Sequence, residues 1–454
     1  MSELRRYHDY KDSGVPWLGE IPSHWEAKRM RFFVNTNPLK SELGIQEGLL
    51  VSFVPMESVA VDGGLTLTTD KEISDVYKGY TYFRNDDVVM AKITPCFENG
   101  KASICNNLTN DIGFGTTELH VLRPKEETSS RFLFYLIRSD VFMKIGESEM
   151  YGAGGQKRVP ESFIKNFVAP LPDIDEQQAI VNFLDDKLDH IDTLIRKQQQ
   201  LIEKLAEQRS AVITHAVTKG LDPNVPMKDS GVEWLGEIPE HWELTYNKYL
   251  FNFSRGLTIT KADLIDEGIP CVNYGEVHSK YGFEVDPNIH PLKCVPESYA
   301  ENFKYAVLKE GDFVFADTSE DYKGSGNFTH LNSKTLTMAG YHTVVMKQKH
   351  DHNHRYLAYM FDSKVFRTQI INRVSGVKVF SVTQGILKRI PAWLPPLTEQ
   401  NNIVIYLDEQ VNRMDRSSEA AKDIIGKLQE YRAALITQAV TGKIDVRHLN
   451  KQAS

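Results

Sequence analysis

The chain has 454 residues, of which 41% are hydrophobic and 25% are charged, and its formal net charge is −8. This length predicts about two to four domains. No apolar stretch approaches the roughly 20 residues that span a bilayer, and the first residues contain no apolar signal core, so we expect a cytoplasmic protein. The four cysteines are widely spaced and form no Cys-x-x-Cys pair, which argues against a zinc site and a disulfide framework.

The first recognisable element, residues 11–26, occurs twice. It returns at residues 228–243 with only two positions changed, and both copies contain a Trp-Leu-Gly-Glu-Ile-Pro-x-His-Trp run. A repeat period of more than 200 residues is far longer than a solenoid unit, so it indicates two whole domains. We interpret His24 and His241, which stand in this run, as packing residues rather than catalytic ones.

Residues 27–170 follow, and they resemble residues 244–393 in pattern although not in sequence. Both segments mix short runs rich in Val, Ile, Phe and Tyr with glycine-containing turns, which is typical of strands. Each segment also contains a short apolar helix, at residues 131–137 and 355–361. We therefore predict two α+β domains in which a common frame presents different surfaces.

A long helix closes each half. Residues 171–222 align without a gap onto residues 394–445, and each segment has a proline near its start and a glycine near its end. Apolar side chains recur in both segments at alternating spacings of four and three, the heptad pattern of a coiled coil. The predicted seam consists of Leu184, Leu188, Ile191, Ile195, Ile202 and Leu205 in the first helix and Leu407, Val411, Met414, Ile425, Leu428 and Leu435 in the second.

The two helices are expected to pack antiparallel, because a large domain separates them and the halves are alike. Polar residues interrupt the seam at Gln198 and at the matched pair Arg209 and Arg432, and such residues commonly fix register. Two separate amphipathic helices, each covering its own domain, are the alternative.

The negative charge is concentrated in these helices. The first helical segment has ten acidic and six basic residues, and the second has eight and six, so together they account for six of the eight net negative charges. The rest of the chain is close to neutral. Net charge therefore does not exclude nucleic acid as a partner.

Known catalytic motifs are not found. The sequence has no Walker loop, and its glycines at 152, 154 and 155 lie in the wrong context for a dinucleotide-binding fingerprint. A histidine-rich run at residues 350–354 has metal-binding side chains, but the other half has no counterpart, and the pattern favours a solvated turn. We expect no catalytic, cofactor-binding or metal-binding residues in this chain.

Polar loops at matched places in the two domains are the candidate binding sites. DNA readers use Lys or Arg for phosphates, and Arg, Lys, Asn, Gln or acidic side chains for base edges. Such groups follow a central predicted strand in each half and occur again in a later loop. The candidate DNA-binding residues are Lys92, Thr94, Gln156, Lys157 and Arg158 in the first domain, and Asp317, Thr318, Lys378 and Ser381 in the second.

The whole arrangement resembles the specificity subunit of type I restriction-modification enzymes. The resemblance is carried by the doubled Trp-Leu-Gly-Glu-Ile-Pro-x-His-Trp runs, the doubled Leu-Pro-x-x-x-Glu-Gln helix starts and the long helices that follow them. It implies an α+β, pseudo-two-fold symmetric chain. Its parts would be target recognition domain 1 at residues 1–170, a helical spacer at 171–226, target recognition domain 2 at 227–393 and a second spacer at 394–454.

The same resemblance implies a role in host defence through DNA methylation. Each recognition domain would read one half of a bipartite double-stranded DNA site, while the helices set the spacing and dock two modification subunits. Two restriction subunits would complete the complex. The resemblance places S-adenosylmethionine, ATP and magnesium on these partners and none in this non-catalytic chain.

Three alternatives stay open at this point. The chain could serve a methylation-only complex, which its own sequence does not distinguish from a restricting one. A coiled-coil scaffold with two protein-binding heads would show no dependence on DNA. An enzyme with an unrecognised active site would place catalytic residues in one half only.

Overall fold

The computed structural model describes residues 5–43, 48–153, 155–322, 324–376 and 378–449. Gly154 and Val377, which belong to the two polar loops, lie outside these ranges. The chain forms two compact units. Unit 1 comprises Met1–Gln199 and Lys422–Ser454, and unit 2 comprises Gln200–Ala421. Each unit therefore contains one globular domain and one half of each long helix.

The long helices are α5 (Ile174–Lys219) and α11 (Leu397–Val440). α5 begins after Pro172, where the Asp173 carboxylate caps the first turn by accepting a hydrogen bond from the Glu176 amide at 2.8 Å. Gly220, with φ of +76°, follows its last residue, and a left-handed residue at this place commonly ends a helix. The proline and glycine signals thus predicted both ends.

The two helices pair antiparallel, as predicted. In unit 1, the N-terminal half of α5 packs with the C-terminal half of α11, and Asp192 pairs with Arg432 at 3.2 Å. In unit 2 the halves are exchanged, and Arg209 of α5 lies 3.8 Å from Asp415 of α11. Every seam residue predicted from the heptads is buried or half-buried, and the two seam arginines have carboxylate partners.

The globular part of unit 1 contains two four-stranded sheets. Its strands are β4 (Val34–Thr36), β5 (Leu50–Val54), β6 (Asp70–Glu72), β7 (Thr81–Arg84), β8 (Val88–Ala91), β9 (Ala102–Ile104), β10 (Ile112–Gly115) and β11 (Leu119–Pro124). The strand orders are β6-β5-β10-β7 and β4-β11-β8-β9. The short helices are α1 (Ile73–Val76), α2 (Ser130–Ile137), α3 (Asp140–Ser148) and α4 (Glu161–Asn166).

Unit 2 repeats this topology and adds to it. Its strands are β16 (Phe251–Arg255), β17 (Ile269–Val272), β18 (Phe283–Val285), β19 (Cys294–Val295), β20 (Val307–Leu308), β21 (Phe313–Ala316), β22 (Thr318–Ser319), β23 (Phe328–Leu331), β24 (Thr337–Ala339), β25 (Thr343–Gln348) and β26 (Phe380–Ser381). The sheets are β16-β25-β21-β23-β18, β19-β17-β24-β20 and β22-β26. The short helices are α6 (Asn247–Leu250), α7 (Ser298–Asn302), α8 (His354–Asp362), α9 (Lys364–Ile371) and α10 (Gln384–Lys388).

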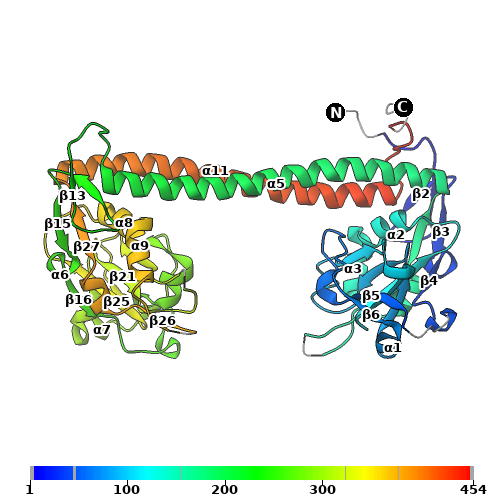
Figure 1. The fold of residues 1–454 in the computed structure, drawn as a ribbon, viewed down its shortest axis with the longest axis horizontal. Helices are drawn as coiled ribbons and strands as arrows, with labels where there is room; N and C mark the ends of the chain where they lie inside the picture. The colour runs from blue at the N-terminus through cyan, green and yellow to red at the C-terminus, as the bar shows by residue number, and fades with distance from the viewer. Residues whose placement is uncertain (1–4, 44–47, 154, 323, 377, 450–454) are drawn as a thin grey trace. The chain divides into compact units, whose positions relative to one another are not determined.

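The two four-stranded sheets of unit 1 have counterparts in unit 2. β10 pairs parallel with β5 and antiparallel with β7, and β24 pairs in the same two senses with β17 and β20. β8 and β21 occupy equivalent central places in their sheets. In each unit a short helix, α2 or α8, lies between the long helices and the sheets (Figure 1). The frame is therefore common to both domains, as the repeats indicated.

The doubled segment ties each domain to the long helices. It forms β1 (Tyr10–Asp12) and β2 (Glu20–Pro22) in unit 1, and β13 (Met227–Asp229) and β14 (Glu237–Pro239) in unit 2. His24 and Trp25 both bond the Glu176 carboxylate, at 2.8 and 2.9 Å. His241 and Trp242 bond Glu399 in the same way, at 2.7 and 3.1 Å. The repeated His-Trp pair thus holds the glutamate at the start of each helix.

Further strands and the repeated glutamine complete this junction. β3 (Glu26–Arg29) pairs with β12 (Val168–Leu171), and β15 (Glu243–Tyr246) pairs with β27 (Pro391–Leu394). Gln177 accepts a hydrogen bond from the Ser129 amide at the start of α2, and Gln400 accepts one from the Asn353 amide at the start of α8. Among the described residues, no helix is both long enough and apolar enough to span a membrane.

Candidate nucleic-acid interface

The polar residues predicted after β8 and β21 lie at a backbone corner in each domain. The end of the central strand, the residue before the next long strand and the later polar loop meet there. We define corner 1 as Lys92, Glu118 and Arg158, and corner 2 as Asp317, His342 and Ser381. The sequence predicted the first and last member of each corner, whereas Glu118 and His342 were missed.

Main-chain hydrogen bonds build the two corners alike. In corner 1, the Lys92 amide donates to the Glu118 carbonyl at 2.9 Å, and the Val159 amide donates to the Lys92 carbonyl at 2.8 Å. In corner 2, the Asp317 amide donates to the His342 carbonyl at 3.1 Å, and the Val382 amide donates to the Asp317 carbonyl at 2.7 Å. The three members of one corner therefore correspond to those of the other.

The side chains of corner 1 are mainly cationic. Arg158 forms a two-bond pair with the Glu118 carboxylate, with Nε and Nη2 each 2.9 Å from an oxygen. These hydrogen bonds lower the pKa of the Glu118 carboxyl below its ordinary value. Lys92 is half-buried, and its ammonium group makes no ion pair within the described ranges. Corner 1 therefore carries a net positive charge.

The side chains of corner 2 have the opposite character. Asp317 replaces Lys92, and its Oδ1 lies 3.4 Å from Nδ1 of His342. Ser381 stands where corner 1 has Arg158, and it pairs in register with Thr318 of β22. Corner 2 is therefore negative when His342 is neutral, so charge is inverted on a common backbone frame.

The remaining predicted residues lie on the same loops. Both the amide and the hydroxyl of Thr94 donate to the Lys157 carbonyl, at 3.0 and 3.3 Å, which brings the strand end and the loop together. Gln156 and Lys157 are exposed beside Arg158, and Lys378 is exposed on the loop that leads to Ser381. Thr94 and Lys157 thus join the strand end to the loop in the first domain, and Thr318 and Ser381 do so in the second.

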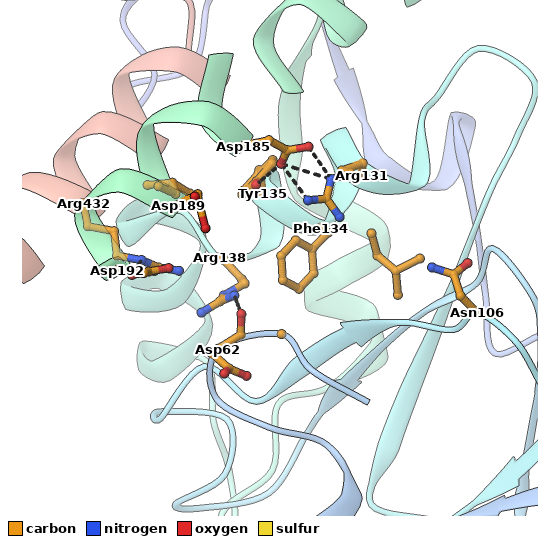
Figure 2. A pocket seen from close by; sticks show the side chains of 13 residues that line it. Asp62, Asn106, Arg131, Phe134, Tyr135, Arg138, Asp185, Asp189, Asp192 and Arg432 are labelled. Atoms are coloured by element: carbon orange, nitrogen blue, oxygen red, sulfur yellow. Dashed lines mark hydrogen bonds and ion pairs between the residues drawn. The ribbon is translucent and has the colours of Figure 1, made fainter. Parts of the chain in front are cut away.

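A polar joint attaches the first domain to the long helices. It surrounds a cavity of ≈ 290 Å³ in unit 1. Asp185 of α5 accepts hydrogen bonds from Arg131 and Tyr135 of α2 (Figure 2). Asp192, seven residues further along α5, pairs with Arg432. The same face of α5 therefore holds both the domain and the other helix.

The second domain has a similar joint. Arg355 and Tyr359 of α8 bond Asp408 of α11, as Arg131 and Tyr135 bond Asp185. Arg138, however, is replaced by Asp362, which pairs with Arg209 at 3.0 Å. In unit 1, burial and the nearby charge of Arg432 lower the pKa of Arg138 to about 10.

The histidine-rich run forms a turn beside the start of α11. His350, His352 and His354 line a cavity of ≈ 500 Å³ in unit 2. In the ranges that the structure describes, no cluster of three His, Cys, Asp or Glu side chains is placed to hold a metal ion. The four cysteines are free thiols.

Comparison with known protein families identifies the family to which this chain belongs. The family described as the type I restriction modification DNA specificity domain matches residues 54–204 and 239–423, one match in each half of the chain. The chain belongs to the family of type I restriction-modification specificity subunits. Its two globular parts are target recognition domains, and its role lies in DNA recognition.

Named relatives support the same assignment for this specificity subunit. The EcoAI specificity subunit from Escherichia coli is 37% identical over 477 residues, covering 87% of this chain and 79% of the relative. The MjaVIII specificity subunit from Methanocaldococcus jannaschii is 24% identical over 324 residues, covering 70% of this chain and 71% of the relative.

Solved structures share the fold of this specificity subunit. A chain from a study of complex assembly and conformational transition in a type I system aligns with a TM-score of 0.72 at 17% identity, covering 93% of this chain and 99% of that one. The HsdS subunit from Thermoanaerobacter tengcongensis aligns with a TM-score of 0.54 at 16% identity, covering 93% and 98%.

Proposed function

We propose that this chain directs a type I complex to a bipartite double-stranded DNA site, with each target recognition domain reading one half. The observation that carries the proposal is the pair of corners: one backbone frame presents Lys92 and Arg158 in unit 1 but Asp317 and Ser381 in unit 2. Two different reading surfaces on one chain suit an asymmetric, two-part target. The half-site spacing then follows from the protein's own geometry, as it does for dimeric DNA readers.

The long helices set this spacing and dock two modification subunits. Large apolar side chains remain exposed on both helices: Leu194 and Leu201 on α5, and Ile405, Ile424 and Tyr431 on α11. Exposed apolar side chains of this kind are available for packing against a protein partner. The acidic balance of the helices also makes them poor ligands for DNA phosphates. A protein is therefore the better occupant of this surface.

The chain selects the DNA site and positions the other subunits on it, and it does not carry out catalysis. In the proposed complex, the modification subunits bind S-adenosylmethionine and methylate adenine after flipping it out of the helix. Two restriction subunits supply ATP- and magnesium-dependent cleavage. A methylation-only complex would use the same chain in the same way.

Methyl transfer with purified components tests the proposal. The modification subunit is incubated with radiolabelled S-adenosylmethionine and unmethylated DNA, with and without this chain. We expect label to enter DNA only when the chain is present, and duplexes lacking the bipartite site to stay unlabelled. Equal labelling without the chain would contradict an addressing role.

The isolated chain is expected to bind DNA weakly. Its net charge is −8, and most of the affinity of DNA-binding proteins comes from basic contacts to phosphates. Much of the phosphate contact should therefore come from the modification subunits. A gel-shift series with the chain alone and with the assembled complex measures this difference. Tight, sequence-specific binding by the chain alone would refute the prediction.

A further inference from the structure

We propose that the two corners read opposite kinds of base edge. Corner 1 donates hydrogen bonds and fits the acceptor edge of guanine, whereas corner 2 accepts them and fits the amino group of cytosine. The inference rests on the proposed function, because it names the bases that each domain recognises. It makes Lys92, Arg158 and Asp317 specificity-determining residues.

The equivalence of the two corners is the first step of the argument. Lys92 and Asp317 each follow the last residue of a central strand, and each bonds the main chain on both sides through the same pair of hydrogen bonds. Because the backbone is the same, the first side-chain atoms leave it at equivalent places. A difference in what the two corners bind must then come from the side chains themselves.

Corner 1 has hydrogen-bond donors to spare. An arginine has five N–H donors, and Glu118 occupies two nitrogens of Arg158, which leaves Nη1 unused by that pair. The carboxylate fixes the plane of the guanidinium, so less conformational freedom is lost when it meets a ligand. Lys92 adds an ammonium group next to it. Guanine presents two acceptors, O6 and N7, in the major groove, and Arg and Lys are its usual partners.

Corner 2 offers an acceptor at the same place. Oδ1 of Asp317 is buried and makes no hydrogen bond among the described residues. Since 34% of the side chain is exposed, the polar atom that faces solvent is Oδ2. An ionised carboxylate only accepts hydrogen bonds, and it suits the amino group of cytosine. It also repels the acceptors of guanine, so it rejects the edge that corner 1 selects.

Modified-base sequencing of three strains tests the assignment. A methylation-free host expresses the modification subunit with the wild-type chain, with Lys92→Met or with Asp317→Asn. We expect Lys92→Met to relax one position that requires guanine on one strand, in one half-site only. Asp317→Asn should relax one position that requires cytosine, in the other half-site. Discrimination at each position should fall by roughly 10-fold to 100-fold.

Matched controls separate base reading from general effects of charge. Lys144→Met and Asp266→Asn remove the same charges at sites with 74% and 85% exposure away from the corners, and both should leave the motif unchanged. Arg158→Gln should relax the same half-site as Lys92→Met. Equal loss of methylation at every site would identify Lys92 as a phosphate contact and overturn its assignment.

The remaining outcomes are also decisive. Relaxation of the same half-site by Lys92→Met and Asp317→Asn would contradict the opposition between the corners, as would an unchanged motif in both. These results presuppose a bipartite wild-type motif. If the wild-type chain directed no methylation, the proposed function itself would fail, which is a different result.

Discussion

Single side chains fix the domains to the long helices. Glu176 and Glu399 each receive two donors from a repeated His-Trp pair. Glu176 is only 4% exposed and lies near Arg447 as well. A buried carboxylate with several donors is costly to disturb, because any change leaves a buried group without its partner. The near-identity of the two repeated segments has a physical explanation in these contacts.

Glu176→Gln is expected to destabilise unit 1. Both donors bond the same oxygen, Oε2, so the amide can keep that acceptor only by placing its NH2 group where Oε1 faces Arg447. It also loses the charge that strengthens both bonds. We expect a loss of about 1–3 kcal/mol in the free energy of unfolding. Urea denaturation followed by tryptophan fluorescence measures it. Glu203→Gln, on an exposed part of α5, serves as the control, and an equal effect of both variants would refute the role of Glu176.

His330 should make unit 2 sensitive to acid. Burial lowers the pKa of His330 to about 3, while an unfolded histidine titrates near 6.5. The unfolded chain therefore binds the extra proton first. This contribution to stability is complete above pH ~6.5 and is lost as the pH falls toward 3, at up to about 1.4 kcal/mol per pH unit.

His330→Phe should remove this contribution while filling the same aromatic cluster. Thermal unfolding at about pH 7.5 and about pH 5.5 should show a smaller decrease in Tm for the variant than for the wild type. His352 and His354 also have lowered pKa values and remain in both proteins, so only the difference counts. His8→Gln, at an exposed position, should behave as wild type. An undiminished decrease in Tm for His330→Phe would contradict the assignment.

At the site, sequence alone predicted Lys92 and Asp317 but missed Glu118 and His342. Lys92 and Asp317 each follow an apolar run that predicts a strand, which is a local signal. Glu118 and His342 reach the corners only because β11 and β25 pair with the central strands. That pairing joins distant segments and depends on the whole sheet. The partner of Arg158 was therefore not predictable from its neighbours in sequence.

At the scale of elements, the burial of side chains along the long helices follows the heptad pattern. Leu407 is fully buried on the seam of α11, while Ile405, two residues earlier, is 67% exposed. Both residues are large aliphatic side chains on one helix. Replacing each of them by alanine therefore separates the contribution of packing from that of helix propensity.

Leu407→Ala is expected to cost about 2–5 kcal/mol because it opens a cavity in the core of unit 2. Ile405→Ala should change stability by no more than about 0.5 kcal/mol, since its side chain is largely in solvent. Chemical denaturation of the two variants measures the difference. Equal losses would show that the seam has been placed on the wrong face.

The helices could be predicted more fully than the sheets. Prolines, glycines and a sustained heptad pattern mark α5 and α11 within the chain itself. The sheets depend on pairings such as the parallel contact between β5 and β10, whose residues are about sixty positions apart. The sequence therefore indicated strands without fixing their neighbours.

At the scale of the whole molecule, the chain repeats one backbone fold with different side chains in its two halves. Each unit has a target recognition domain, half of each long helix and a joint in which aspartates hold a short helix. The change from Arg138 to Asp362 shows that even the joint differs in charge between units. The proposed spacing of half-sites depends on the length of the helices between the two domains.

Insertion of one heptad into both helices, after Glu203 and Gly426, should lengthen the unread spacer. Seven residues add about 10 Å of helix, which corresponds to about three base pairs of DNA. The heptad keeps the seam in phase, so both half-sites should stay the same. Modified-base sequencing determines the new motif, and an unchanged spacer in a methylating strain would refute the spacing role.

The most direct test of the central claim is modified-base sequencing of DNA from a methylation-free host. One strain expresses this chain with its modification subunit, and the other expresses the modification subunit alone. Our account predicts adenine methylation at a single bipartite motif, and only in the first strain. Identical methylation in both strains, with both proteins soluble and assembled, would contradict it.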